Sequence, residues 1–184
     1  MTTYPIHTVE TAPHGARQSL AGLQQAFGLV PNLAATMASS PPLLNSFVQV
    51  LGQFAGGTFA GGERQVLLLS NAVANGCEWA VAFHSTMALK EGVEPSEVEA
   101  VRRGEPPADA RLAALSALTR SLIDKRGHLD DADAKAFTAA GFDDDQLLEV
   151  VTGVAISTMA NYSGNIARPP LEAPFRPQAW DAGR

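Results

Sequence analysis

The chain has 184 residues, of which 46% are hydrophobic and 17% are charged, and its formal net charge is −6. This length is enough for one domain with a buried core, and the composition is typical of a globular protein. Because the net charge is negative and the basic residues are scattered, the sequence has no basic face that would bind nucleic acid or an acidic membrane surface. We expect neither nucleic acid nor a membrane as a partner.

The N-terminal residues 1–5 lack the basic and apolar segments of a signal peptide. No apolar run approaches the roughly 18 residues that a membrane-spanning helix needs. The sequence contains one cysteine, Cys77, so a framework of internal disulfides is excluded. These features predict a soluble cytoplasmic protein.

Apolar residues recur at helical spacing along most of the chain, and no stretch alternates like a β-strand. Proline and glycine residues divide the pattern into segments. The predicted helices cover residues 13–27, two segments that follow Pro31 and Pro41, residues 63–75 and 77–92, a short segment from Pro95, and residues 109–127 and 143–168. Residues 63–75 are apolar on nearly all sides, which predicts a central buried helix. We expect a single all-α domain over residues 1–184.

The last predicted helix and the residues beyond it differ in character. The helix begins with the negative charges of 143–145, and its residues repeat at helical spacing. This repeat comprises Leu147, Leu148, Val151, Val154, Ala155, Thr158, Met159 and Tyr162. Residues 168–184 are rich in proline and carry the apolar Leu171, Phe175 and Trp180. Since exposed apolar groups are costly in water, we expect an extended, non-helical tail that packs on the body or on a neighbouring subunit.

Cys77 stands in the first turn of the predicted helix 77–92, after a turn at residues 75–76. The unsatisfied N–H groups at a helix N-terminus favour a thiolate, which makes Cys77 a candidate nucleophile. His84 follows seven residues later on the same face, with Ala80 between them. At about 1.5 Å rise per residue, the two Cα atoms lie on the order of 10 Å apart, too far for a direct hydrogen bond. The alternative is a buried thiol that acts only as a small apolar residue.

Several short motifs follow one another in a recognisable order. They are Val30-Pro31-Asn32-Leu33, Ser40-Pro41, Glu63-Arg64-Gln65-Val66, Asn75-Gly76-Cys77-Glu78-Trp79-Ala80, Ala82-Phe83-His84-Ser85 and Asn161-Tyr162. Together they resemble the AhpD-like, or carboxymuconolactone decarboxylase, family from about residue 30 to residue 175, and in particular its peroxidase-related branch. The resemblance implies an all-α AhpD-like fold and a homo-oligomer built through the helices near the active site.

The resemblance also implies a chemistry. In AhpD-like members, the second cysteine of a Cys-x-x-Cys motif attacks a peroxide, and the first resolves the sulfenic acid as a disulfide. A glutamate and a histidine relay the proton. The resemblance matches the first cysteine to Cys77 and the histidine to His84, whereas Ala80 replaces the second cysteine and Gln65 the glutamate. Glu63, two residues earlier, is a candidate substitute for that glutamate.

These departures leave three functions open. The first is an alkylhydroperoxidase-like thiol oxidoreductase in which Cys77, assisted by His84, reduces a peroxide and an external thiol resolves the product. The second is a non-redox enzyme that acts on a small carbonyl or lactone acid, with His84 as general acid or base. The third is a non-catalytic binding or assembly subunit, because fold does not dictate function.

The candidate site residues fall into two groups. The catalytic candidates are Cys77, His84, Glu63 and Gln65. Trp79, Ala80, Phe83 and Asn161 are candidate substrate-binding residues, and the alternative for Trp79 and Phe83 is packing in the core. We expect no metal and no other cofactor.

Overall fold

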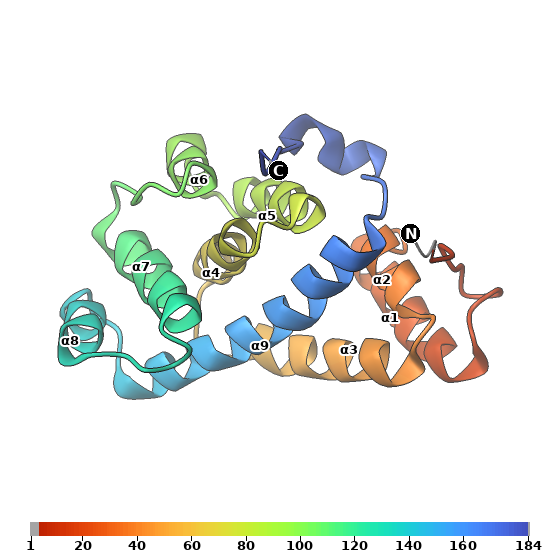
Figure 1. Ribbon diagram of the computed structural model, residues 1–184, viewed down its shortest axis with the longest axis horizontal. Coiled ribbons are helices and arrows are strands. Elements are labelled where there is room, and N and C mark those ends of the chain that lie inside the picture. Colours follow the sequence, from red (N-terminus) through yellow and green to blue (C-terminus); the bar gives the residue numbers. More distant parts are fainter. Residues whose placement is uncertain (1–3, 184) are drawn as a thin grey trace.

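The computed structural model describes residues 4–183, so residues 1–3 and Arg184 of the expected domain lie outside the described part. Figure 1 shows helices joined by short loops, and no strand occurs within the described range, which confirms the predicted all-α class. The α-helices are α1 (Arg17–Phe27), α2 (Asn32–Met37), α3 (Pro41–Ala55), α4 (Gly61–Ala74), α5 (Glu78–Lys90), α6 (Pro95–Arg102), α7 (Ala110–Asp124), α8 (Asp131–Ala139) and α9 (Asp144–Ala167). Two 3-10 segments, η1 (His14–Ala16) and η2 (Ala173–Gln178), complete the fold.

Local signals set three of the helix ends where the sequence predicts them. Helix α1 stops at Gly28, which adopts the left-handed conformation with φ 75° that favours glycine. Helix α3 begins with Pro41, whose missing N–H would have no partner at a helix start. Asp109 caps α7 by accepting hydrogen bonds from the N–H groups of Arg111 and Leu112.

Helix α8 lies in a segment for which the sequence predicts no helix. Its nine residues bury only Phe137, too few apolar positions to show a helical period. A capping box begins the helix, because the side chains of Asp130 and Asp133 each accept a backbone N–H of the other. A hydrogen bond from Lys125 lowers the pKa of Asp133 to about 2. The ring of Phe137 stacks on Phe142 at 4.3 Å and ties α8 to the body.

Helix α4 lies at the centre of the fold and packs against α5, α7 and α9, as expected for a central buried helix. The buried apolar residues of the described range form two clusters on its two sides. Val66 and Leu69 belong to the cluster shared with α1, α2 and α5, whereas Leu67 and Leu68 belong to the cluster shared with α7, α8 and α9. No helix within residues 4–183 is both long and apolar enough to cross a lipid bilayer.

Helix α9 runs along the length of the molecule, with α7 and α8 near one end and α2 near the other (Figure 1). The repeat noted in its sequence lies largely on the outer side, since Leu148 is 67% and Tyr162 is 56% exposed. Its inner side includes small residues, because the neighbouring helices approach closely there. A Cβ atom added at Gly153 would lie 2.5 Å from Leu67 Cδ2.

The tail after α9 packs on the body of the same chain, beside α5 (Figure 1). The sequence predicts a fully extended tail, but residues Ala173–Gln178 form a 3-10 turn. Arg102 holds the tail by donating hydrogen bonds to the carbonyl groups of Gln178 and Ala179, and Trp180 Nε1 donates to the carbonyl of Arg102. Phe175 is buried.

Candidate active site

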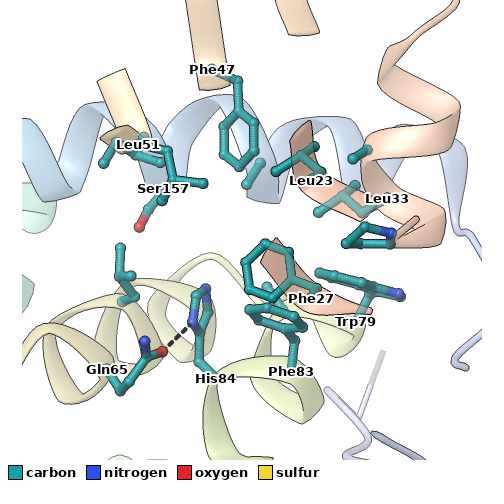
Figure 2. Close-up of a pocket in the computed structure, with 16 residues that line it drawn as sticks. Leu23, Phe27, Leu33, Phe47, Leu51, Gln65, Trp79, Phe83, His84 and Ser157 are labelled. Atoms are coloured by element: carbon teal, nitrogen blue, oxygen red, sulfur yellow. Dashed lines mark hydrogen bonds between the residues drawn. The ribbon is translucent and has the colours of Figure 1, made fainter. Parts of the chain in front are cut away.

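A cavity of about 90 Å³ lies between α1, α2 and α3 on one side and α4, α5 and α9 on the other. Figure 2 shows that its walls are mainly apolar, and they include Leu23, Phe27, Phe47, Leu51, Trp79 and Phe83. Among the described residues that line the cavity, three have polar side chains: Gln65, His84 and Ser157. None of the described residues that line it carries a charged side chain.

His84 and Gln65 form a hydrogen-bonded pair at one side of the cavity. His84 Nδ1 lies 2.9 Å from Gln65 Oε1, and Figure 2 shows the His84 ring extending from α5 into the cavity. Because an amide oxygen only accepts, Nδ1 carries the proton and Nε2 keeps a lone pair. Burial lowers the pKa of His84 to about 3, so the ring is neutral at pH 7. His84 Nε2 is therefore an acceptor for a proton or a hydrogen bond.

Four of the residues singled out in the sequence lie together on α5. Trp79, Ala80, Phe83 and His84 all line the cavity, with Ala80 one turn before His84. The rings of Trp79 and Phe83 stack at 5.1 Å. They also form a wall that the tail supports, because Phe175 packs edge-on against both rings. The position of the missing second cysteine thus belongs to the cavity.

A carboxylate from the tail fixes this wall further. Glu172 accepts a hydrogen bond of 2.9 Å from Trp79 Nε1 and another from the backbone N–H of Asn32, the first residue of α2. Glu172 therefore links two helices that border the cavity. The sequence analysis gave Glu172 no role, since its partners are 140 and 93 residues away in the chain.

Cys77 lies outside this cavity. It is the N-cap of α5 rather than a residue of its first turn, with the extended backbone angles φ −92° and ψ 96°. It is 1% exposed, and it is not among the residues that line the cavity. A methyl group added at Gly164 would come within 2.7 Å of Cys77 Sγ, so the sulfur packs closely against α9. Cys77 and His84 therefore have different surroundings.

Glu63 and Asn161 also lie away from the cavity. Glu63 forms an ion pair with Arg111 and accepts a hydrogen bond of 2.9 Å from the N–H of Ala60. The guanidinium group of Arg111 lies 3.6 Å from the centre of the Phe142 ring, so this group of residues ties the start of α4 to α7. Asn161 is 1% exposed and is not a lining residue.

Ser157 is a cavity residue that the sequence analysis missed. Its side chain is buried, and Oγ has no hydrogen-bond partner among the residues that the structure describes. A buried hydroxyl without a partner costs about 1–3 kcal/mol. In the sequence, Ser157 stands between Ile156 and Thr158 in a helix rich in small and apolar residues, with no motif to mark it.

We find no match for this sequence among curated proteins. Residues 41–120 match the model of the carboxymuconolactone decarboxylase family. A peroxidase-related protein from Ralstonia eutropha JMP134, described as an alkylhydroperoxidase AhpD core, has 21% identity and a TM-score of 0.81, and the match covers 94% of this chain and 93% of that one. A peroxidase-related protein from Silicibacter sp. TM1040 has 18% identity and a TM-score of 0.77, over 95% and 92% of the two chains.

A third similar structure is the debrominase Bmp8, as a cysteine-to-alanine variant in complex with 2,3,4-tribromopyrrole. It has 16% identity and a TM-score of 0.78, and the match covers 97% of this chain and 95% of that one. The similar structures agree with the family match in the fold that they assign, although their names differ in activity. The family match over residues 41–120 and the similar structures support an AhpD-like member of the carboxymuconolactone decarboxylase family.

Proposed function

We propose that this protein is a non-redox enzyme in which His84 acts as a general base on a small, neutral carbonyl compound. The observation that carries the proposal is the neutral His84 ring in the cavity, held by Gln65 with its Nε2 lone pair available. Cys77 takes no part in this reaction, because its sulfur packs against α9 outside the cavity. The proposal therefore favours acid–base chemistry over the reduction of a peroxide by Cys77.

The lining of the cavity limits the substrate. A carboxylate would need a cationic partner when it leaves water, and none of the described lining residues supplies one. An apolar cavity of about 150 Å³ accommodates benzene. At about 90 Å³, this cavity suits only a small molecule, such as a ketone of a five-membered ring. We therefore propose a neutral ring ketone or lactone rather than a lactone acid.

The proposed step is the transfer of a proton from the carbon next to the carbonyl group to His84 Nε2. The C–H electron pair forms the enolate, and the same proton returns to another carbon, so no oxidant or reductant is needed. The low pKa of His84 reflects an empty, apolar site. An enolate beside the imidazolium would raise that pKa in the complex, because opposite charges attract strongly away from water. Gln65 holds the ring through Nδ1 throughout the step.

The debrominase of similar fold supports the choice of a small ring, since that protein is in complex with 2,3,4-tribromopyrrole. The support is limited to the single five-membered ring of that ligand. In this chain, the proposed chemistry depends on His84 and Gln65.

The test uses 3-cyclopentenone, whose base-catalysed isomerisation to 2-cyclopentenone is followed by the ultraviolet absorbance of the conjugated product. We expect turnover by the wild type and by Cys77→Ala, and a decrease in kcat of about 10²–10⁴-fold in His84→Leu. His128→Leu, a change at an exposed histidine, is the matched control and should leave kcat unchanged. Turnover that persists in His84→Leu would refute the proposal, as would peroxide consumption that Cys77→Ser abolishes.

We further infer that the protein forms a homo-oligomer through the outer side of α9. Leu148, Val151, Tyr162 and Ile166 are 67%, 49%, 56% and 66% exposed on this one helix. Apolar side chains exposed together along a helix are typical of an interface between proteins. Sedimentation equilibrium should give a mass above that of one chain, and Leu148→Glu should lower it; a monomeric wild type would refute the inference.

A further inference from the structure

The hydroxyl group of Ser157 is a polar group that the proposed step leaves unused. The residue is 3% exposed, and Oγ makes no hydrogen bond within the described part of the chain. A serine in a helix ordinarily satisfies its hydroxyl by donating to the carbonyl group four residues earlier. Two neighbours in α9 do so: Thr158 donates to the carbonyl of Val154 at 2.9 Å, and Ser163 donates to that of Met159 at 2.6 Å. Ser157 differs from both.

The position of Ser157 explains the difference. It lines the same cavity as His84, but it comes from α9, whereas His84 comes from α5. Figure 2 shows its oxygen directed across the cavity, toward the side where Gln65 and His84 lie. Thr158, by contrast, is not among the lining residues. The cavity thus has a hydroxyl donor on one wall and a neutral nitrogen acceptor on the other.

We propose that Ser157 is a second catalytic residue, whose hydroxyl donates a hydrogen bond to the carbonyl oxygen of the substrate. The inference rests on the proposed function, because it assigns the oxygen of the same substrate whose α-carbon faces His84. When His84 Nε2 takes the proton, the C–H electron pair becomes the enolate double bond and the carbonyl π electrons move to oxygen. Ser157 keeps its own proton and stabilises the negative oxygen. No further reactant enters the step.

This assignment narrows the class of substrate. The molecule must carry a carbonyl oxygen and an acidic C–H group on the adjacent carbon, so that the oxygen reaches α9 while the carbon faces α5. A neutral cyclic ketone or lactone fulfils this requirement. A purely hydrocarbon ring of the same size would leave Ser157 Oγ without a partner and would bind less tightly.

The test uses cyclopentanone as a probe that binds without isomerising, with wild type, Ser157→Ala and the matched control Thr158→Val. The hydroxyl of Thr158 bonds within its own helix, so its loss should not reach the cavity. We expect the infrared C=O stretch of bound cyclopentanone to lie at lower frequency in wild type and Thr158→Val than in Ser157→Ala. With 3-cyclopentenone, kcat should fall by about 10²–10³-fold in Ser157→Ala, with a small change in KM. Thermal unfolding should show Ser157→Ala folded.

The outcomes separate the two proposals. An identical C=O frequency in wild type and Ser157→Ala would overturn the role of Ser157, even if His84→Leu still abolishes isomerisation. If the C=O frequency differs between wild type and Ser157→Ala but the wild type does not isomerise 3-cyclopentenone, the general-base function is refuted and the hydroxyl contact is supported. A cyclopentanone that does not bind to the wild type would overturn the assignment of this cavity to a ring ketone.

Discussion

The start and the middle of helix α5 differ more than their sequence suggests. At the start, Cys77 is packed against α9 and is 1% exposed. Two turns later, His84 lies at a cavity with a hydrogen-bonded partner. The seven-residue spacing places both residues on one face only if both have helical backbone angles. Cys77 is an N-cap with ψ 96°, so helical spacing does not fix the direction of its side chain.

The comparison shows at which position of α5 a thiol would share the cavity with His84. Ala80, not Cys77, shares the cavity with His84. Because residue 80 is alanine, none of the described residues that line the cavity brings a thiol beside His84. The acid–base group that the proposed proton transfer needs is in place.

The largest expected effect comes from Ala80→Cys, which would place a thiol in the cavity one turn before His84. We expect peroxide consumption in the presence of dithiothreitol to rise by about 10²-fold over wild type, with His84 as the base. The introduced thiolate attacks the peroxide, gives a sulfenic acid and releases an alcohol or water. The Cys77 thiol then displaces water to form a disulfide.

Intact mass checks this sequence of steps. After one equivalent of peroxide in the absence of dithiothreitol, the disulfide lowers the mass by two hydrogen atoms in Ala80→Cys. Adding Cys77→Ser should leave the sulfenic acid, which dimedone traps. If Ala80→Cys consumes no more peroxide than wild type, the assignment of residue 80 to a reactive cavity is wrong.

A smaller effect should follow from crowding the cysteine end of α5. In Gly164→Ala the new methyl group would lie 2.7 Å from Cys77 Sγ, and overpacking of about 3 kcal/mol exceeds the ~1 kcal/mol that alanine gains over glycine in a helix. We expect a net loss of about 2 kcal/mol in the free energy of unfolding, measured with urea. Gly52→Ala is the control, because this exposed glycine of α3 has open space around it and should give a gain. Equal effects at both positions would contradict close packing at Cys77.

The surroundings of His84 should affect the pH dependence of stability. The folded pKa of His84 is about 3, below its ordinary value of 6.5, so between these values the unfolded chain binds the extra proton. Stability therefore falls as the pH drops below 6.5, by about 1.4 kcal/mol between pH 7.5 and 5.5. Urea unfolding of His84→Gln should lack this loss. Carboxylates such as Asp133, with a pKa of about 2, act at lower pH. Parallel pH profiles for the two proteins would rule out a buried neutral His84.

Much of the fold follows from local signals that the sequence carries. The breaks at Gly28 and Pro41 and the cap at Asp109 predict real helix ends. Helix α8 does not follow, since its capping box is local but its single buried residue gives no period. The inner face of α9 does not follow from the apolar repeat either, because close packing places small residues such as Gly153 there, while several long apolar residues, such as Leu148, are exposed.

The candidate site also contains some residues that the sequence predicts and others that only the three-dimensional structure places. Helical spacing and the family motifs bring His84, Ala80 and Gln65 to one cavity, since each has helical backbone angles. The position of Cys77 depends on a single cap residue, which spacing cannot reveal. Ser157 comes from a helix about 70 residues later in the chain, and only the three-dimensional packing of α9 against α4 and α5 places its hydroxyl opposite His84.

The most direct test of the central claim is a crystal structure of the wild-type protein with cyclopentanone bound. We predict the ring in the cavity, with its oxygen within hydrogen-bond distance of Ser157 Oγ, its α-carbon beside His84 Nε2 and no contact with Cys77 Sγ. Density for the ring against Cys77 Sγ, or for the ring outside the cavity that His84 borders, would contradict the division of α5 into a packed start at Cys77 and a reactive middle at His84.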